Sequence, residues 1–192
     1  MGARALEFAA LTAARSGEVR GATWDEIDLV KGVWAIPAQR MKAKRAHRVP
    51  LPERAIALLE ALPRQEGNPL VFPAARGGEL SDMTLSAAMK RMHQSAVAAA
   101  GGDETAGFID PRSKRPAVPH GLRSVFRQWA AERGFARDMS ELALAHFIGS
   151  EVERAYQRSD MVERRRAMMA DWAGYLRGRS VADNVVVLGV SA

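Results

Sequence analysis

A histidine and two arginines around residue 120 are spaced so that one helix would carry them on the same face. Pro119 suits the first turn of a helix, and on a helix beginning there His120, Arg123 and Arg127 fall within about 60° of arc. His120 and Arg123 would then lie at the helix N-terminus, where free backbone N–H groups and the helix dipole favour an anion. An imidazole and a guanidinium at this position predict a phosphate-binding site. Taken by itself, this helix favours the alternative that the three side chains form only its solvent-exposed face.

The segment Pro-His-Gly-Leu-Arg at residues 119–123 resembles the His-x-x-Arg box of the tyrosine recombinases of the phage-integrase type. An earlier part of the chain, residues 12–19 followed by residues 23–28, resembles the first box of the same family, whose arginine would be Arg15. Arg15 could alternatively serve only as an ion-pair partner of a nearby carboxylate such as Glu18. We expect Glu18 to orient the arginine and not to act as an acid or base.

A basic loop between two predicted strands resembles the β-hairpin that carries the family's catalytic lysine. Met41-Lys42 lies in this loop and residues 48–51 follow it, so the catalytic lysine would be Lys42. Lys44 is the next candidate, because several basic side chains share the loop. The basic residues of the hairpin and one arginine of the helix at 119 are also predicted to contact DNA: Arg40, Lys44, Arg45, Arg48 and Arg127.

Two further boxes follow in the expected order. Residues 144–149 resemble the box that holds a second histidine, which would be His146. Residues 155–158, Ala-Tyr-Gln-Arg, resemble the nucleophile box and assign that role to Tyr156. Ten residues separate the histidine from the tyrosine, close to the family's usual interval. The alternative for His146 is that it only caps the end of a helix.

The resemblance extends over about residues 6–177 and implies a fold: the tyrosine recombinase catalytic domain, mainly α with a small antiparallel β-sheet (α+β). We expect this domain to span residues 1–178. The tail, residues 179–192, could pair with a sheet edge of its own or a neighbouring subunit, or could simply fray. Integrases of this type carry an N-terminal DNA-clamping domain, which we expect to be absent because Met1 falls just before the first box.

The resemblance also implies a reaction, site-specific DNA recombination through a covalent 3′-phosphotyrosine. Tyr156 would attack the phosphodiester, and Arg15 and Arg123 would stabilise the negative charge that grows on the non-bridging oxygens. A tyrosine has a free pKa near 10, so it needs a base or a strong field to act as a nucleophile.

Proton transfer is assigned to the other three residues. His120 would accept the tyrosine proton, and His146 would hydrogen-bond the phosphate or position the tyrosine. Lys42 would protonate the leaving 5′-oxygen. Neither a metal, ATP nor any other cofactor is expected.

Apolar spacing predicts the helices and strands that position these residues. On the helix from Pro119, the residues Leu122, Val125, Phe126 and Trp129 are predicted to be buried; Met92 is predicted to face inward on an earlier helix capped by Ser81, and Tyr175 to pack against Trp172. Helices are predicted over residues 2–14, 52–62, 160–177 and from residues 81, 119, 138 and about 151, and strands over residues 33–36 and 48–51.

Composition fits a DNA-binding protein but does not single one out. The 192 residues carry a net charge of +6 and a sequence pI near 10.3, which ribosomal and membrane-surface proteins share. There are no cysteines and no apolar run long enough for a membrane span, so we expect a cytoplasmic, nucleoid-associated protein without a membrane partner. The expected partner is double-stranded DNA at attachment sites, on which the protein would form a homo-tetramer, with a monomer expected in solution.

Three other functions are alternatives to recombination. A metal-dependent nuclease lacks support because no carboxylate cluster or His-Glu-x-x-His motif is present. Type IB topoisomerases use the same residue types, but the flanking sequence resembles integrases more closely. A DNA-binding remnant of a truncated integrase, without catalytic activity, is the alternative from another functional class.

Overall fold

The structure is a computed structural model that describes residues 1–111, 113–146 and 160–178. Within these ranges the fold is mainly helical with one small antiparallel sheet, which confirms the predicted fold class. The nucleophile box with Tyr156, the predicted short helix near Glu151 and the tail at 179–192 lie outside the described residues. The α-helices are α1 (Gly2–Thr12), α2 (Ser16–Arg20), α3 (Glu53–Glu60), α4 (Thr84–Ala99), α5 (Pro119–Glu132), α6 (Arg137–Ala143) and α8 (Val162–Leu176). The strands are β1 (Ile27–Asp28), β2 (Val33–Ile36) and β3 (His47–Pro50), and short 3-10 turns are η1 (Trp24–Glu26), η2 (Ala38–Arg40) and η3 (Glu104–Ala106).

The sheet has the strand order β1-β2-β3, and β2 and β3 form the predicted hairpin. Trp34 lies opposite Val49, and Ile36 lies opposite His47. Trp34 and Ile36 are fully buried because alternate residues of a strand point to one face, and this face lies against the core. The third strand, β1, was not predicted, since a strand of two residues is too short to show a periodic pattern.

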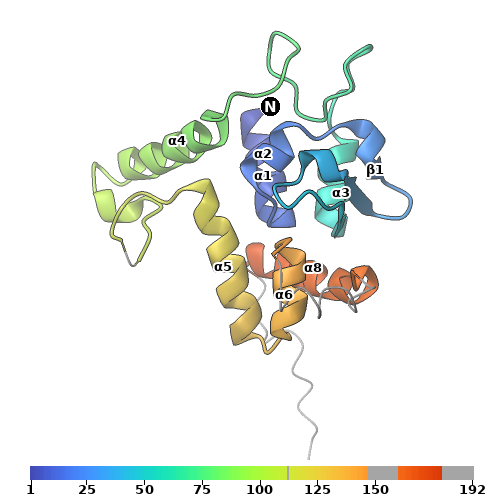
Figure 1. The fold of residues 1–192 in the computed structure, drawn as a ribbon. Coiled ribbons are helices and arrows are strands. Elements are labelled where there is room, and N and C mark those ends of the chain that lie inside the picture. The colour runs from blue at the N-terminus through green and yellow to red at the C-terminus, as the bar shows by residue number, and fades with distance from the viewer. Residues whose placement is uncertain (112, 147–159, 179–192) are drawn as a thin grey trace, which may run out of the picture.

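One core forms between α1 and the sheet, and α3 and α4 also pack against α1. Phe8 of α1 contacts Trp34 and Phe72, with ring centroids 5.3 and 5.4 Å apart. Burying a side chain of this size stabilises a fold by about 1.5–3 kcal/mol. In Figure 1 these N-terminal elements lie above the C-terminal helices, and α4 projects to the left.

A second core joins α5, α6 and α8 below the first. Phe126 and Trp129 of α5 meet Trp172 of α8, with ring centroids 5.3 and 5.2 Å apart. Tyr175 stacks on Trp172 at 5.5 Å, which confirms its predicted packing role. The Trp172 indole Nε1 donates a hydrogen bond to the Ala10 carbonyl at 2.7 Å, so α8 is attached to the end of α1.

Two of the burial predictions were wrong. Val125 is 46% exposed, because α5 packs along the line of Phe126 and Ala130 and Val125 lines an open groove beside it. Met92 is 47% exposed, because the second half of α4 extends past the helix it packs on. The cap of α4 also differs: the N-cap is Met83, and the Ser81 side chain contacts the Thr84 hydroxyl at 3.0 Å without capping a backbone N–H.

No helix within the described ranges is both long enough and apolar enough to cross a lipid bilayer.

Candidate active site

Arg123 lies where the two cores meet and is held from three directions. Only 5% of its surface is exposed. Its Nη1 donates to the Ala13 carbonyl at 2.5 Å and its Nη2 to the Leu144 carbonyl at 2.8 Å. Nη2 also lies 3.2 Å from Nε2 of His146. A guanidinium has five N–H donors, so these contacts fix its plane and still leave donors for an anion.

Both carbonyls that hold Arg123 come from the C-terminal ends of helices. Ala13 is the residue after α1 and has φ of 50°, and Leu144 follows α6 just before Ala145, which also has φ of 50°. The last carbonyls of a helix lack partners within it, and the negative end of the helix dipole favours a cation. Arg123 therefore satisfies the ends of α1 and α6 together, which explains how so buried a charge is tolerated.

Arg15 lies near Arg123 and is oriented by Glu18. The Arg15 backbone N–H donates to one Glu18 carboxylate oxygen and its Nη1 to the other, both at 2.8 Å. Burial and the positive charge of Arg15 lower the pKa of Arg123 to about 10, and Glu18 opposes this effect. Arg123 thus stays protonated at neutral pH. Two guanidinium groups facing one buried carboxylate leave a local excess of positive charge, which suits an anion such as a phosphate.

The contacts of His146 define its tautomer. A guanidinium can only donate, so Nε2 of His146 must accept from Arg123 and carries no proton. Nδ1 then holds the proton and donates a hydrogen bond to the Glu141 carboxylate, with 2.7 Å between Nδ1 and Oε2. Nε2 of His146 therefore faces the Arg123 guanidinium, and Nδ1 faces the Glu141 carboxylate. These contacts go beyond the simple helix-capping alternative.

Glu141 of α6 supports this histidine and was not predicted from the sequence. One of its oxygens accepts from His146, and the other accepts from Arg127 Nε at 2.6 Å. Burial raises the pKa of the Glu141 carboxyl, but the hydrogen bonds from His146 and Arg127 outweigh it and lower the pKa below its ordinary value. A carboxylate on a predicted helix, five residues before His146, was the only sequence signal available.

We predict that Glu141→Gln lowers the free energy of unfolding by about 1–3 kcal/mol at pH 7, since it weakens two charge-assisted hydrogen bonds. The pKa of Glu141 is lower in the folded protein than the ordinary glutamate value of 4.5. This stabilisation is therefore present above pH 4.5 and is lost as the pH falls through the pKa of the folded state. Chemical denaturation at pH 7 and at successively lower pH values measures the difference. Glu132→Gln is the matched control, since Glu132 accepts a single exposed hydrogen bond from Gln128. A gap between wild type and Glu141→Gln that widens on acidification below 4.5 would contradict the prediction.

The hairpin loop that carries Lys42 is attached to the body of the protein by its neighbours. Arg40 bonds both the Glu26 carboxylate and the Glu18 backbone carbonyl, so it connects the loop to α2. Met41 is buried to 2% exposure. Lys42 itself is exposed, and it forms no hydrogen bond or ion pair with any residue that the structure describes. Among the described residues, Lys42 therefore presents an unpaired ammonium beside two anchored residues.

The predicted base His120 occupies the first turn of α5 and is exposed, one helical turn before the buried Arg123. The expected helix start at Pro119 is thus confirmed, but the two side chains do not share a solvent-exposed face. Tyr156 lies outside the described residues, so its distance from these groups stays a matter of prediction.

His47, a histidine that was not among the predicted site residues, is the first residue of β3. Burial and the charge of Arg165 lower its pKa to about 4, and a hydrogen bond with the Ala143 backbone partly opposes this. His47 is therefore neutral at physiological pH. It joins β3 to α6, the helix that ends on Arg123.

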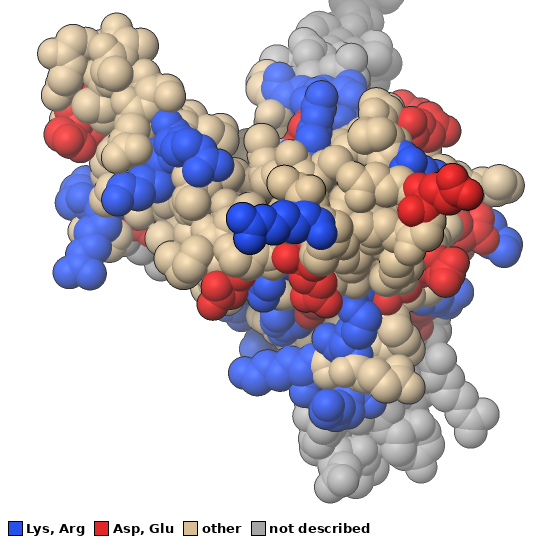
Figure 2. Space-filling view, turned by 90° about the horizontal axis from the view of Figure 1, so that it is seen from above, with Lys and Arg blue, Asp and Glu red and all other residues tan. Residues whose placement is uncertain are grey.

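Three of the five predicted DNA contacts have acidic partners inside the protein. Arg40 pairs with Glu26, Arg48 with Asp160 and Arg127 with Glu141, whereas Lys44 and Arg45 are exposed in the hairpin loop without such a partner among the described residues. Figure 2 shows basic side chains in several separate groups on the face seen from above, with acidic ones between them. No single basic patch dominates this face, so the anion-binding site is identified by local geometry and not by the overall distribution of charge.

No group of three or more His, Asp or Glu side chains in the described ranges is arranged to hold a metal ion.

Comparison with known proteins places this geometry in context. The Phage integrase family matches residues 2–163. The prophage integrase IntA of Escherichia coli K12 is 40% identical over 170 residues, which cover 87% of this chain and 37% of IntA. The integrase of Enterobacteria phage P4 is 33% identical over 189 residues, covering 90% of this chain and 39% of that protein. The chain therefore spans less than half the length of these two relatives.

Solved structures of recombinases share the fold. The crystal structure of XerA recombinase superimposes with a TM-score of 0.52 and 17% identity, covering 93% of this chain and 63% of that one. XerH site-specific recombinase, solved in a pre-cleavage complex with its difH substrate, gives a TM-score of 0.51 and 20% identity, covering 85% of this chain and 44% of that one.

Proposed function

The chain belongs to the phage integrase family of tyrosine recombinases, and on this premise we propose that it cleaves and rejoins DNA in site-specific recombination. The intermediate is a covalent bond between Tyr156 and a DNA 3′-phosphate. The single observation that carries the proposal is the setting of Arg123, a buried guanidinium fixed by two helix ends beside Arg15 and His146. Such a preorganised group stabilises charge that develops on a phosphate without rearranging during the reaction.

In the proposed reaction the scissile phosphate binds to Arg15 and Arg123. The Tyr156 oxygen forms a bond to phosphorus while the bond from phosphorus to the 5′-oxygen breaks. His120 takes the tyrosine proton, and Lys42 gives a proton to the departing 5′-oxygen. The same steps in reverse join a 5′-hydroxyl from a partner strand to the 3′-phosphate.

His146 contributes as a hydrogen-bonding group. With Nδ1 donating to Glu141, its Nε2 can accept from Arg123 or from a protonated phosphate oxygen. Protonation of Nε2 would strengthen the Glu141 pair and turn the ring into a donor toward the phosphate.

DNA binding is proposed to use Lys44 and Arg45, which stand exposed beside Lys42. Arg40, Arg48 and Arg127 would contact DNA only by sharing or exchanging their carboxylate partners. We further propose that residues 1–178 form the catalytic domain and that residues 179–192 make a tail. Assembly as a homo-tetramer on attachment-site DNA, in the bacterial nucleoid, completes the proposal.

A nicked suicide duplex tests the function. Its sequence is the junction flanking the source gene, and its nick lies close to the cleavage site so that the released strand diffuses away and traps the intermediate. We expect a denaturation-resistant adduct, and protease digestion with mass spectrometry should place the nucleotide on the peptide that contains Tyr156. Tight DNA binding without any adduct would instead support the non-catalytic DNA-binding remnant.

We predict that Lys42→Ala slows cleavage of an ordinary duplex by about 10²- to 10³-fold, because it removes the proton donor to the leaving group. On a duplex whose scissile 5′-oxygen is replaced by sulfur, the same variant should cleave at close to the wild-type rate. A thiol has a pKa of about 8.5, so its thiolate leaves without an acid. The rate of adduct formation on the two duplexes is the measurement.

Lys44→Ala is the matched control for this prediction. As a DNA contact only, Lys44 should affect both duplexes equally. Selective rescue of Lys44→Ala by the sulfur-containing duplex, with no rescue of Lys42→Ala, would assign the acid to Lys44.

A further inference from the structure

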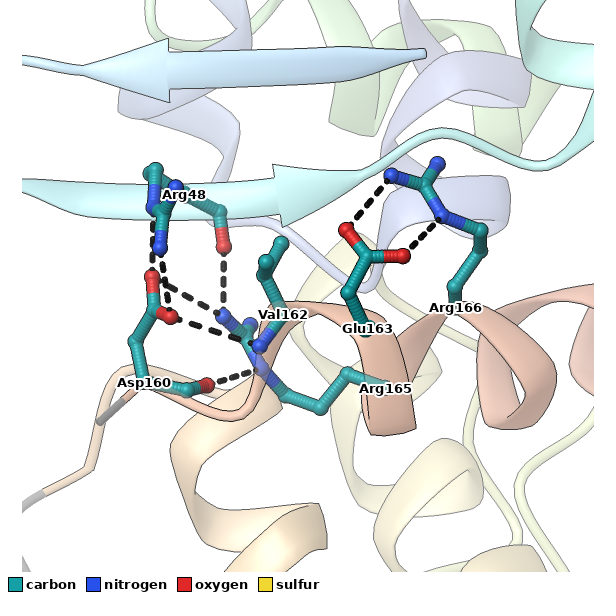
Figure 3. Close-up of polar contacts among 6 residues, drawn as sticks. All are labelled: Arg48, Asp160, Val162, Glu163, Arg165 and Arg166. Carbon is teal, nitrogen blue, oxygen red and sulfur yellow. Dashed lines mark hydrogen bonds and ion pairs between the residues drawn. The ribbon is translucent and has the colours of Figure 1, made fainter. Parts of the chain in front are cut away.

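A cluster of charged groups joins β3 to the start of α8, and Figure 3 shows it in close-up. Arg48 of β3 donates two hydrogen bonds to the carboxylate of Asp160, from Nε to Oδ2 at 2.7 Å and from Nη2 to Oδ1 at 2.8 Å. This is the bidentate geometry in which a guanidinium and a carboxylate are held in register. We call Arg48, Asp160 and Arg165 the β3–α8 clasp.

Arg165 closes the clasp from the interior side. Only 1% of its surface is exposed, which is unusual for a cation. Its Nε donates to the Asp160 backbone carbonyl and its Nη2 to the Arg48 backbone carbonyl, both at 2.8 Å. Its Nη2 also lies 3.8 Å from the Asp160 carboxylate. The clasp therefore fixes both the side chain and the backbone of Asp160 against β3.

Asp160 also shapes the turn that leads into α8. Its Oδ1 accepts a hydrogen bond from the Val162 backbone N–H at 3.3 Å. Met161 lies between them and has φ of 51°, a left-handed backbone conformation that costs free energy for residues other than glycine. Burial raises the pKa of Asp160, but its bonds to Arg48 and its attraction to Arg165 outweigh this and lower the pKa. Asp160 is thus ionised at neutral pH and can hold the turn.

The position of the clasp in the sequence links it to two of the proposed catalytic residues. Asp160 follows Tyr156 by four residues, and Arg48 follows Lys42 by six. A chain of four residues spans at most about 14 Å, so anchoring Asp160 limits how far the preceding tyrosine can lie from β3. The clasp connects the segment of the nucleophile to the hairpin of the general acid across 112 residues of sequence.

We propose that Arg48, Asp160 and Arg165 are positioning residues for DNA cleavage, which they promote by anchoring Asp160, four residues after Tyr156 in the sequence, to the strand that follows the Lys42 loop. This inference rests on the proposed function. It assigns Arg48 a role other than the DNA contact expected from its place in a basic loop. The Arg48–Asp160 ion pair is exposed and contributes about 0–1 kcal/mol to stability, so a large effect of Arg48→Ala on cleavage would have to come from positioning.

Single-turnover cleavage of the nicked junction duplex, at saturating protein, tests the proposal. We expect Asp160→Asn and Arg48→Ala each to slow adduct formation by about 10- to 100-fold, since small misplacements of reacting groups cost rates of this size. The affinity for the duplex should change by less than about twofold, and the salt dependence of binding should stay the same. The double variant should be no slower than the slower single variant, because both changes break one unit.

Glu163→Gln is the matched control, since both Glu163 oxygens accept from Arg166 on the same helix and Glu163 makes no hydrogen bond with Arg48, Asp160 or Arg165. It should cleave at the wild-type rate. Cleavage at the wild-type rate by Asp160→Asn would overturn the positioning role of the clasp and leave the proposed function intact. The proposal would also be overturned if Arg48→Ala only weakened DNA binding and reduced the slope of log affinity against log salt concentration by about one, because Arg48 would then be a DNA contact. Absence of an adduct with wild type as well would overturn the proposed function and the clasp together.

Discussion

Replacing Tyr156 with phenylalanine is expected to abolish the covalent adduct with the nicked duplex, the largest effect of any single substitution in this chain. Phenylalanine lacks the oxygen that forms the bond to phosphorus, and no other group of the proposed site can replace it. DNA binding should persist at close to wild-type affinity, because the arginines that hold the phosphate are unchanged. Gel electrophoresis under denaturing conditions measures the adduct, and a mobility shift measures binding.

The chain offers a matched control for this experiment because it has only two tyrosines. Tyr175 stacks on Trp172 in the second core, so Tyr175→Phe keeps the ring, the packing and the adduct. An adduct that survives in Tyr156→Phe and disappears in Tyr175→Phe would show that the nucleophile has been assigned to the wrong residue.

Arg123→Lys is the second substitution with a large expected effect, and we predict about a 10²- to 10³-fold slower cleavage although the charge is kept. The donors of a lysine ammonium all sit on one nitrogen. Lysine therefore cannot hydrogen-bond the Ala13 and Leu144 carbonyls and also bind a phosphate in the bidentate way that a planar guanidinium does. Arg123→Ala should be at least as slow. Single-turnover rates at saturating protein measure both variants.

The free energy of unfolding of these variants must also be measured, since Arg123 donates hydrogen bonds to the backbone carbonyls at two helix ends. Loss of a charged donor to a buried carbonyl costs about 1.5–3 kcal/mol, and each kcal/mol lowers the Tm of a domain this size by about 2–4 °C. Arg133→Ala, at the exposed end of the same helix, is the control for both measurements. Wild-type cleavage by Arg123→Lys, in a variant that is measurably less stable, would show that Arg123 serves the fold and not the reaction.

Sequence reasoning located the secondary structure near the proposed site well, because it depends on local patterns. The start of α5 at Pro119 and the pairing of residues 33–36 with a following strand both follow from residue types within a few positions. The burial of Val125 was mispredicted because a helical pattern gives the apolar face of a helix but not the width of the neighbour that covers it.

The proposed site shows the same division. Sequence spacing and family resemblance singled out Arg15, Arg123 and His146, and the structure brings these three together. Glu141 was missed, because a carboxylate on an amphipathic helix looks like any other solvated charge until its partners are known.

The sequence by itself determined which residue types the site contains, in what order, and on which helices and strands most of them lie. Only the tertiary structure decided how the arginines are used. Arg123 was expected on a solvent-exposed face and is buried between helix ends, while Arg48, whose expected DNA contact stays a prediction, binds Asp160. The reason is physical: backbone periodicity is set by neighbours along the chain, whereas the partner of a charged side chain is set by whichever group the fold brings within about 3 Å. For Arg48 that group lies 112 residues away.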